Sequence, residues 1–114
     1  MKPKKVTSIP GLFGSIDHYD ETGKYLGYSM PGLFGGTDHY DSNGNRVGYS
    51  LDGLICSREH YRTNGENIGY SVPGIFGGED FFGADGKPIG YSTPNILSGS
   101  TFFGDNEIIW GRSF

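Results

Sequence analysis

Carboxylates and aromatic rings recur in this sequence at a spacing suited to ligand binding. An acidic residue stands two positions before an aromatic one in four places, and the pairs are Asp17/Tyr19, Asp38/Tyr40, Glu59/Tyr61 and Asp80/Phe82. Residues two apart share one face of a β-strand. Stacked copies would therefore align a row of rings edged by carboxylates, a surface suited to sugar faces or to cations held by cation–π attraction. These eight residues are the candidate ligand-binding site.

A structural interpretation of the same row remains open. Tyrosine and phenylalanine also stabilise strand pairing and cover facing glycines. The last copy keeps the ring as Phe103 but replaces the acid with Thr101.

Three histidines, His18, His39 and His60, form a second series. Imidazoles beside carboxylates can bind a transition metal. Strand neighbours, however, stack one residue per copy and do not converge as a tetrahedral site requires. Phe81 and Phe102 take the same position later in the chain. We therefore favour packing and predict no metal site.

Other chemistry has little support. The turns starting at Asp20 and Asp41 lack the full ligand series of a calcium loop, and an Asx turn explains their aspartates. No nucleophile motif or phosphate loop is present, so we predict neither an enzyme nor a cofactor. The single cysteine, Cys56, excludes an intramolecular disulfide and is expected to be a small buried residue.

The composition and charge of the chain limit the classes of partner that it is expected to bind. The chain has 114 residues, a net charge of −4 and 21 glycines. Without a basic patch, nucleic acid is not an expected partner. No apolar run is long enough for a membrane span, and no signal peptide is visible. The default expectation is the cytoplasm, or the cell surface if a leader has been removed.

A repeat positions all these residues. Gly-Tyr-Ser recurs every 21 residues, starting at Gly27, Gly48, Gly69 and Gly90, and a degraded copy starts at Gly111. A fixed period of this kind indicates a repeat array. We predict one domain over residues 1–114, with an N-terminal tail at 1–7 and five repeats across 8–114.

Each repeat is predicted to be a β-hairpin. In the second copy, residues 37–41 and 45–50 are the strands, and Gly44 supplies a left-handed turn residue. A three-residue loop would place Asp41 opposite Asn45 and His39 opposite Val47. Tyr49 would then share the face of His39, and a one-residue slip would invert this sorting.

Two apolar series are expected to form the core. One comprises Leu26, Val47, Ile68, Ile89 and Trp110, of which Trp110 could cover an exposed core end. The other lies in the links between hairpins, where we expect the pairs to tuck under neighbouring hairpins: Leu12-Phe13, Leu33-Phe34, Leu54-Ile55, Ile75-Phe76 and Ile96-Leu97.

The segment from Tyr40 to Tyr49, Tyr-Asp-Ser-Asn-Gly-Asn-Arg-Val-Gly-Tyr, resembles the hairpin repeats of bacterial choline- and glucan-binding cell-wall modules. It is similar more loosely to MORN repeats. The first resemblance implies stacked aromatic hairpins that recognise a ligand, although this chain has only Trp110 where those modules carry recurrent tryptophans.

We therefore predict an all-β array of five hairpins that forms an open twisted meander or superhelix, with a closed ring or barrel as the alternative. The predicted function is non-enzymatic binding of a carbohydrate or a protein through the repeated aromatic-acidic surface. The alternative is a structural, self-assembling repeat protein, because exposed strand edges permit homo-oligomers.

Overall fold

The structure, a computed structural model, describes residues 4–32, 35–53, 57–74, 77–95 and 99–104. One short 3-10 turn, η1 (Leu12–Gly14), follows the first strand. The strands are β1 (Lys4–Pro10), β2 (Ile16–Asp20), β3 (Tyr25–Pro31), β4 (Thr37–Asp41), β5 (Arg46–Asp52), β6 (Arg58–Arg62), β7 (Asn67–Pro73), β8 (Glu79–Gly83), β9 (Pro88–Pro94) and β10 (Ser100–Gly104).

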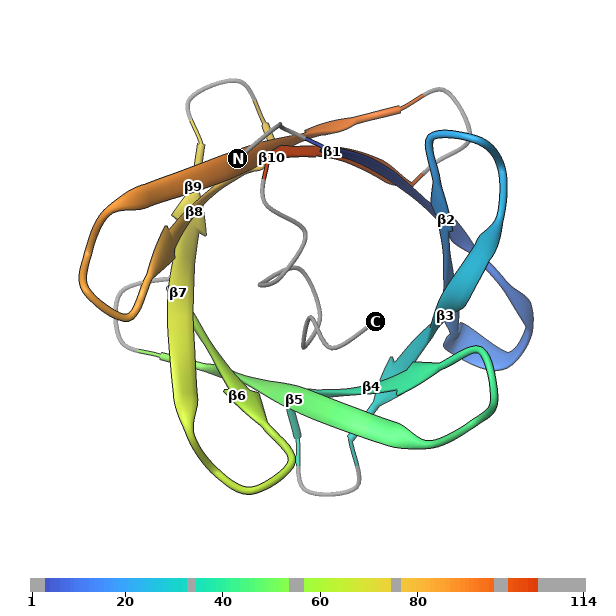
Figure 1. Cartoon of the computed structure of the whole chain (residues 1–114), viewed down its shortest axis with the longest axis horizontal. Helices are drawn as coiled ribbons and strands as arrows, with labels where there is room; N and C mark the ends of the chain where they lie inside the picture. Colours follow the sequence, from blue (N-terminus) through green and yellow to red (C-terminus); the bar gives the residue numbers. More distant parts are fainter. Residues whose placement is uncertain (1–3, 33–34, 54–56, 75–76, 96–98, 105–114) are drawn as a thin grey trace.

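These ten strands form one closed antiparallel barrel (Figure 1). Each strand pairs with its neighbours in the chain, and β1 also pairs with β10. The prediction of an all-β array of hairpins is confirmed, but the arrangement is the closed barrel given as the alternative and not the open meander that was preferred. Seen down the barrel, the hairpins project outward around the ring (Figure 1).

Strand β1 completes the ring from the other end of the chain. Ser8 lies one repeat before Ser29, so β1 occupies the place of a return strand whose outgoing partner is β10. Residues 1–7 were expected to be a tail, and this is corrected for 4–7, which belong to β1. The expected fifth return strand around Trp110 lies outside the described residues.

The hairpin turns follow the predicted chemistry. The Asp41 N–H donates to the Asn45 carbonyl at 2.9 Å, as expected for a three-residue loop. Gly44 has φ 86°, the left-handed conformation for which glycine is needed. The Asp41 carboxylate also accepts the N–H groups of Asn43 and Asn45, which makes the predicted Asx turn.

One residue after this turn, the predicted register is wrong. His39 pairs with Gly48 and not with Val47, while Tyr40 still pairs with Arg46. A β-bulge therefore places the extra residue, Val47, in the return strand. The same irregularity occurs in the hairpins β2–β3, β6–β7 and β8–β9.

The bulge changes which residues share a face. Gly48 lies opposite the His39 ring, and Ser50 follows on the same inner side. Tyr49 pairs with Asp38 and with Tyr61, so it joins the outer aromatic residues and not the histidine face. The glycine opposite each histidine leaves room for the imidazole inside the barrel.

The apolar core differs from the expected one. Among the described residues the buried apolar side chains are Val6, Phe81 and Phe102. Residues of the predicted core series are only half-buried, although Leu26, Ile68 and Ile89 pack against this cluster. The difference arises because the bulge takes this series out of the regular inward alternation.

The first apolar link is also corrected. Leu12 and Phe13 do not tuck under a hairpin, because their exposed fractions are 78% and 92%. Phe13 adopts a left-handed φ of 57° within η1. Cys56 and the remaining link pairs, Leu33-Phe34, Leu54-Ile55, Ile75-Phe76 and Ile96-Leu97, lie outside the described residues.

Replacing Val6 tests whether β1 holds the barrel closed. Val6 is 1% exposed and packs with Phe81 and Phe102. Val6→Ala should lower the free energy of unfolding by roughly 2 kcal/mol, because it leaves a cavity in the small apolar core. Urea denaturation measures this change. The matched control is Lys5→Ala, which alters the exposed neighbour; equal midpoints for the two variants would show that this contact does not stabilise the barrel.

Candidate ligand-binding surfaces

The outer wall carries a band of aromatic rings in cross-strand pairs. Tyr28 stacks on Tyr40 with ring centroids 4.9 Å apart, and Tyr49 stacks on Tyr61 at 5.0 Å. We call the outer aromatic band the residues Tyr19, Tyr28, Tyr40, Tyr49, Tyr61, Tyr70, Phe82, Tyr91 and Phe103. It contains all the predicted aromatic site residues, namely Tyr19, Tyr40, Tyr61 and Phe82.

Four of the nine residues of this band were missed from the sequence. Tyr28, Tyr49, Tyr70 and Tyr91 come from the Gly-Tyr-Ser markers, which the assumed register placed on the histidine face. Strand pairing instead sets each of these rings between the acid of the preceding strand and the aromatic residue of the following one. The signal that could have revealed this is the glycine before each tyrosine, which suits a position opposite a large side chain.

The four predicted acids have different surroundings. Asp17 pairs across the strands with Tyr28. Asp38 forms an ion pair with Arg46 at 3.0 Å, and the Glu59 carboxylate accepts a hydrogen bond from the Asn67 amide at 3.1 Å. At Asp80 the repeat supplies Pro88, which has no side-chain donor. Within the described part of the chain, no cation or amide contacts the Asp80 side chain.

Arg46 also covers part of the second hairpin. Its guanidinium carbon lies 4.8 Å from the centre of the Tyr49 ring, within cation–π distance. That ring is thus occupied by Arg46 and Tyr61. In the fourth hairpin, Pro88 takes the place of Arg46 and leaves the equivalent ring, Tyr91, 49% exposed.

An apolar groove lies beside Tyr91. It has a volume of about 670 Å³, and its walls come from β8, β9 and β10, including Asp80, Phe82, Pro88, Tyr91 and Phe103. The Tyr91 and Phe103 rings are 5.4 Å apart and tilted by 32°. This groove combines open aromatic surface with a carboxylate that faces solvent.

The inner wall carries a continuous chain of hydrogen-bonded hydroxyl and imidazole groups. Ser29 Oγ lies 2.7 Å from His18 Nε2 and 2.7 Å from His39 Nδ1, and Ser50 Oγ bridges His39 and His60 at the same distances. This inner polar chain consists of Ser8, His18, Ser29, His39, Ser50, His60 and Ser71. All seven are buried.

Alternation of the two residue types lets every member be satisfied. A neutral imidazole has one N–H and one bare nitrogen, and a hydroxyl donates once and also accepts. A ring between two serines can therefore donate to one and accept from the other, and all the bonds can run in one direction. The histidine series is thus used for packing and hydrogen bonding, which was favoured over a metal.

Burial keeps these imidazoles neutral. It lowers the pKa of His18 and of His60 from 6.5 to about 3. The pKa of His39 is also far below its ordinary value, first through burial and then through the neighbouring His18 and His60. A charged imidazole would need water that this wall excludes.

The side chains in the described ranges do not form the geometry of a transition-metal or calcium site. No group of three histidine, cysteine or acidic side chains comes together there in a way that could hold a metal ion. In the first hairpin turn the Asp20 carboxylate accepts bonds from the Thr22 hydroxyl and from the N–H groups of Thr22 and Lys24. These bonds, the Thr22 hydroxyl first, lower the pKa of Asp20.

Comparison with known proteins returns no relative: no family model, no curated protein and no solved structure matches the chain. The choline-binding and MORN resemblances therefore stay predictions. Over the residues described, no helix has the length and apolar character needed to cross a membrane.

The inner polar chain predicts that stability falls as the pH falls. In the unfolded chain the three imidazoles bind protons below pH about 6.5, whereas in the folded barrel His18 and His60 do so only near pH 3. The free energy of unfolding should thus have its full value above pH 7 and decrease as the pH falls below 7. With three sites that titrate, the decrease is up to roughly 4 kcal/mol per pH unit.

Urea denaturation at pH 7, 6 and 5 measures this effect. The control is the single variant His60→Phe, since Phe81 already occupies the equivalent position in the fourth hairpin and stacks on the His60 ring. This variant should lose about one third of the pH dependence over the same range, because one of three titrating sites is removed. An equal slope in both proteins would show that His60 is not a source of it.

Removing one hydroxyl from the chain should also be costly. Ser50→Ala removes the hydroxyl that is hydrogen-bonded to His39 Nε2 and to His60 Nδ1, and it should destabilise the barrel by roughly 2–4 kcal/mol. Ser92→Ala is the matched control, because this serine stands in the same repeat position and bonds only the Glu79 N–H among the described groups. Denaturation midpoints compare the two variants, and equal losses would contradict the role given to the chain.

Proposed function

We propose that this protein is a non-enzymatic binding module that recognises carbohydrate on its outer aromatic band, chiefly in the groove beside Tyr91. The observation that carries the proposal is the exposed Tyr91 ring, which stands next to Phe103 and across the strands from Asp80. The candidate residues remain Asp17, Tyr19, Asp38, Tyr40, Glu59, Tyr61, Asp80 and Phe82, with Tyr91 and Phe103 added.

The chemistry of the groove suits a sugar. One face of a pyranose ring presents C–H groups, and an aromatic ring gives it a flat apolar surface of matching shape. The hydroxyl groups at the ring edge need acceptors, and the Asp80 carboxylate offers two oxygens. A few polar groups set in an apolar concave wall are typical of ligand sites.

The other hairpins support the choice of this groove. In the second hairpin the acid is paired with Arg46, which also lies over Tyr49. In the third, Glu59 is bonded to Asn67. In both hairpins the acid is already bonded within the protein, whereas the equivalent acid of the fourth hairpin is available to a ligand.

The structural alternative, self-assembly through free strand edges, has a weaker basis in a closed barrel. Every described strand is paired on both sides. Association of copies would need another surface, such as the outer band itself. A protein ligand on that band is the second binding possibility, and the experiment below separates it from carbohydrate.

The test is a glycan array probed with the full chain. We expect binding to at least one glycan class, and Tyr91→Ala should weaken it by about tenfold or more, equivalent to roughly 1.4 kcal/mol. Asp80→Asn should weaken it less, because the amide keeps one acceptor oxygen. Isothermal titration with the best glycan measures both variants.

Tyr49→Ala is the matched control, because Arg46 already covers that ring. It should leave glycan affinity close to that of the parent protein. The proposal fails if no glycan binds, or if Tyr49→Ala and Tyr91→Ala weaken binding equally. The first result would direct attention to protein ligands.

A further inference from the structure

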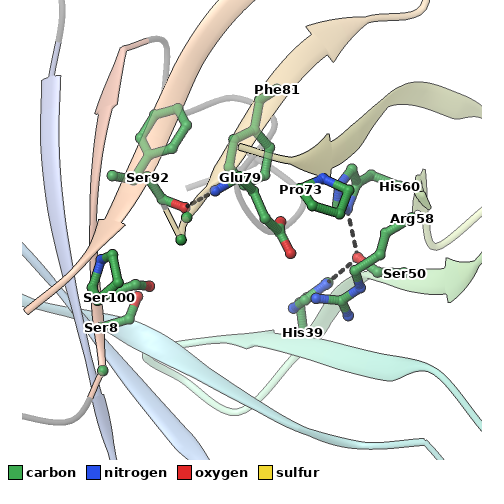
Figure 2. A pocket seen from close by; sticks show the side chains of 15 residues that line it. Ser8, His39, Ser50, Arg58, His60, Pro73, Glu79, Phe81, Ser92 and Ser100 are labelled. Atoms are coloured by element: carbon green, nitrogen blue, oxygen red, sulfur yellow. Dashed lines mark hydrogen bonds between the residues drawn. The ribbon is translucent and has the colours of Figure 1, made fainter. Parts of the chain in front are cut away.

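A second concave site opens inside the barrel, at the end that carries the linking loops. It is a cavity of about 380 Å³ whose walls include His39, Ser50 and Phe81 (Figure 2). Arg58 and Glu79, the first residues of β6 and β8, line the same cavity. None of the residues of the outer groove except Phe81 contributes to it.

The two charges are departures from the repeat. The equivalent positions around the barrel mouth are Ile16, Thr37, Arg58, Glu79 and Ser100. Only two of the five are charged, they come from successive repeats, and they have opposite signs. No structural role common to the repeats requires a charge there, because the other copies use an aliphatic residue or a hydroxyl.

Neither charge is neutralised by the other. Arg58 donates from Nη2 to Thr37 Oγ1 at 2.9 Å, which fixes the guanidinium against the β4 side of the cavity. The remaining N–H groups of a guanidinium stay able to bind an anion. Among the described residues no ion pair links Arg58 to Glu79, and Figure 2 shows the Glu79 carboxylate directed into the cavity.

The walls behind these charges divide into two kinds. On one side His39, Ser50 and His60 belong to the inner polar chain, and their hydrogen bonds are already made to one another. On the other side Phe81 and Phe102 meet edge to face at 5.1 Å. The cavity thus offers a cationic group, an anionic group and an apolar aromatic wall.

We infer that this cavity binds a small zwitterion, namely an α-amino acid with an apolar side chain. Its carboxylate pairs with the Arg58 guanidinium, its ammonium group pairs with Glu79, and its side chain lies against Phe81 and Phe102. Charge-assisted hydrogen bonds of this kind are stronger than neutral ones, and Arg binds carboxylates through two parallel N–H groups.

The same two charges select against simpler ions. A plain carboxylate meets the repulsion of Glu79, and a plain amine meets that of Arg58. Discrimination through a repulsive group is a common source of specificity. A ligand that carries both charges is the one that satisfies both walls.

Isothermal titration with the full chain tests the inference through three probes that share the leucine side chain. These are L-leucine, L-leucinamide, which lacks the carboxylate, and N-acetyl-L-leucine, which lacks the ammonium group. L-leucine should bind, and each analogue should bind about tenfold more weakly or worse, because each loses one charge-assisted contact. Titrations with L-phenylalanine and L-methionine extend the series to other apolar side chains.

Two neutral substitutions assign the contacts. Arg58→Gln should weaken L-leucine binding by about tenfold or more while leaving the affinity for L-leucinamide no lower. Glu79→Gln should do the same with N-acetyl-L-leucine as the insensitive probe. Thermal unfolding confirms that each variant is folded, and the comparison of the three probes on the parent protein does not depend on either variant.

The outer groove provides the control that separates this site from the proposed glycan site. Tyr91→Ala should leave L-leucine binding unchanged, and Glu79→Gln should leave glycan binding unchanged. The inference is overturned if none of the three amino acids binds, if the three leucine probes bind equally, or if Tyr91→Ala abolishes L-leucine binding.

Discussion

The mutual hydrogen bonding of buried serine and histidine is the interaction on which this barrel depends. Burying a hydroxyl or an imidazole without a partner costs a few kcal/mol. Ser29, His39 and Ser50 avoid that cost because each lies within 2.7 Å of the next. The pairing works only when the strands keep one register around the ring. The polar inner wall therefore specifies the register.

The same choice of residues leaves space inside. An eight-stranded barrel is just wide enough for its side chains to fill, and this ring has ten strands. Its inward residues include glycines and serines, which are small. Gly48 stands opposite His39 and contributes no side chain at all. A cavity at the mouth is the expected result, and the apolar core shrinks to the small cluster around Phe81 and Phe102.

The period of 21 residues was sufficient to predict the hairpins, their turns and the antiparallel order, because glycine, proline and aspartate act locally. It was not sufficient for the face of Tyr49. The face of Tyr49 depends on a bulge at Val47, and no local conformational preference of valine indicates a bulge there. Closure by β1 was missed for a related reason: Val6 and Thr7 stand where later copies have Gly27 and Tyr28, so the strand does not look like a repeat. Pairing between chain ends is a long-range property. The predicted acids lie on the expected strands, and their partners differ because the return strands carry Arg46, Asn67 and Pro88 at the equivalent position.

In a repeat array, a residue that recurs in every copy usually serves the fold. A residue that differs from its equivalents in the other copies is a candidate for a function specific to one site. Such departures gather around three successive residues of strand β8. Glu79 brings the negative charge to the cavity, Asp80 lacks the partner that Arg46 provides to Asp38, and Phe81 interrupts the inner polar chain. Strand alternation sends the first and third inward and the second outward. One strand thus contributes to both candidate sites, and because its register is held by the ring as a whole, the two surfaces are positioned by the same hydrogen bonds.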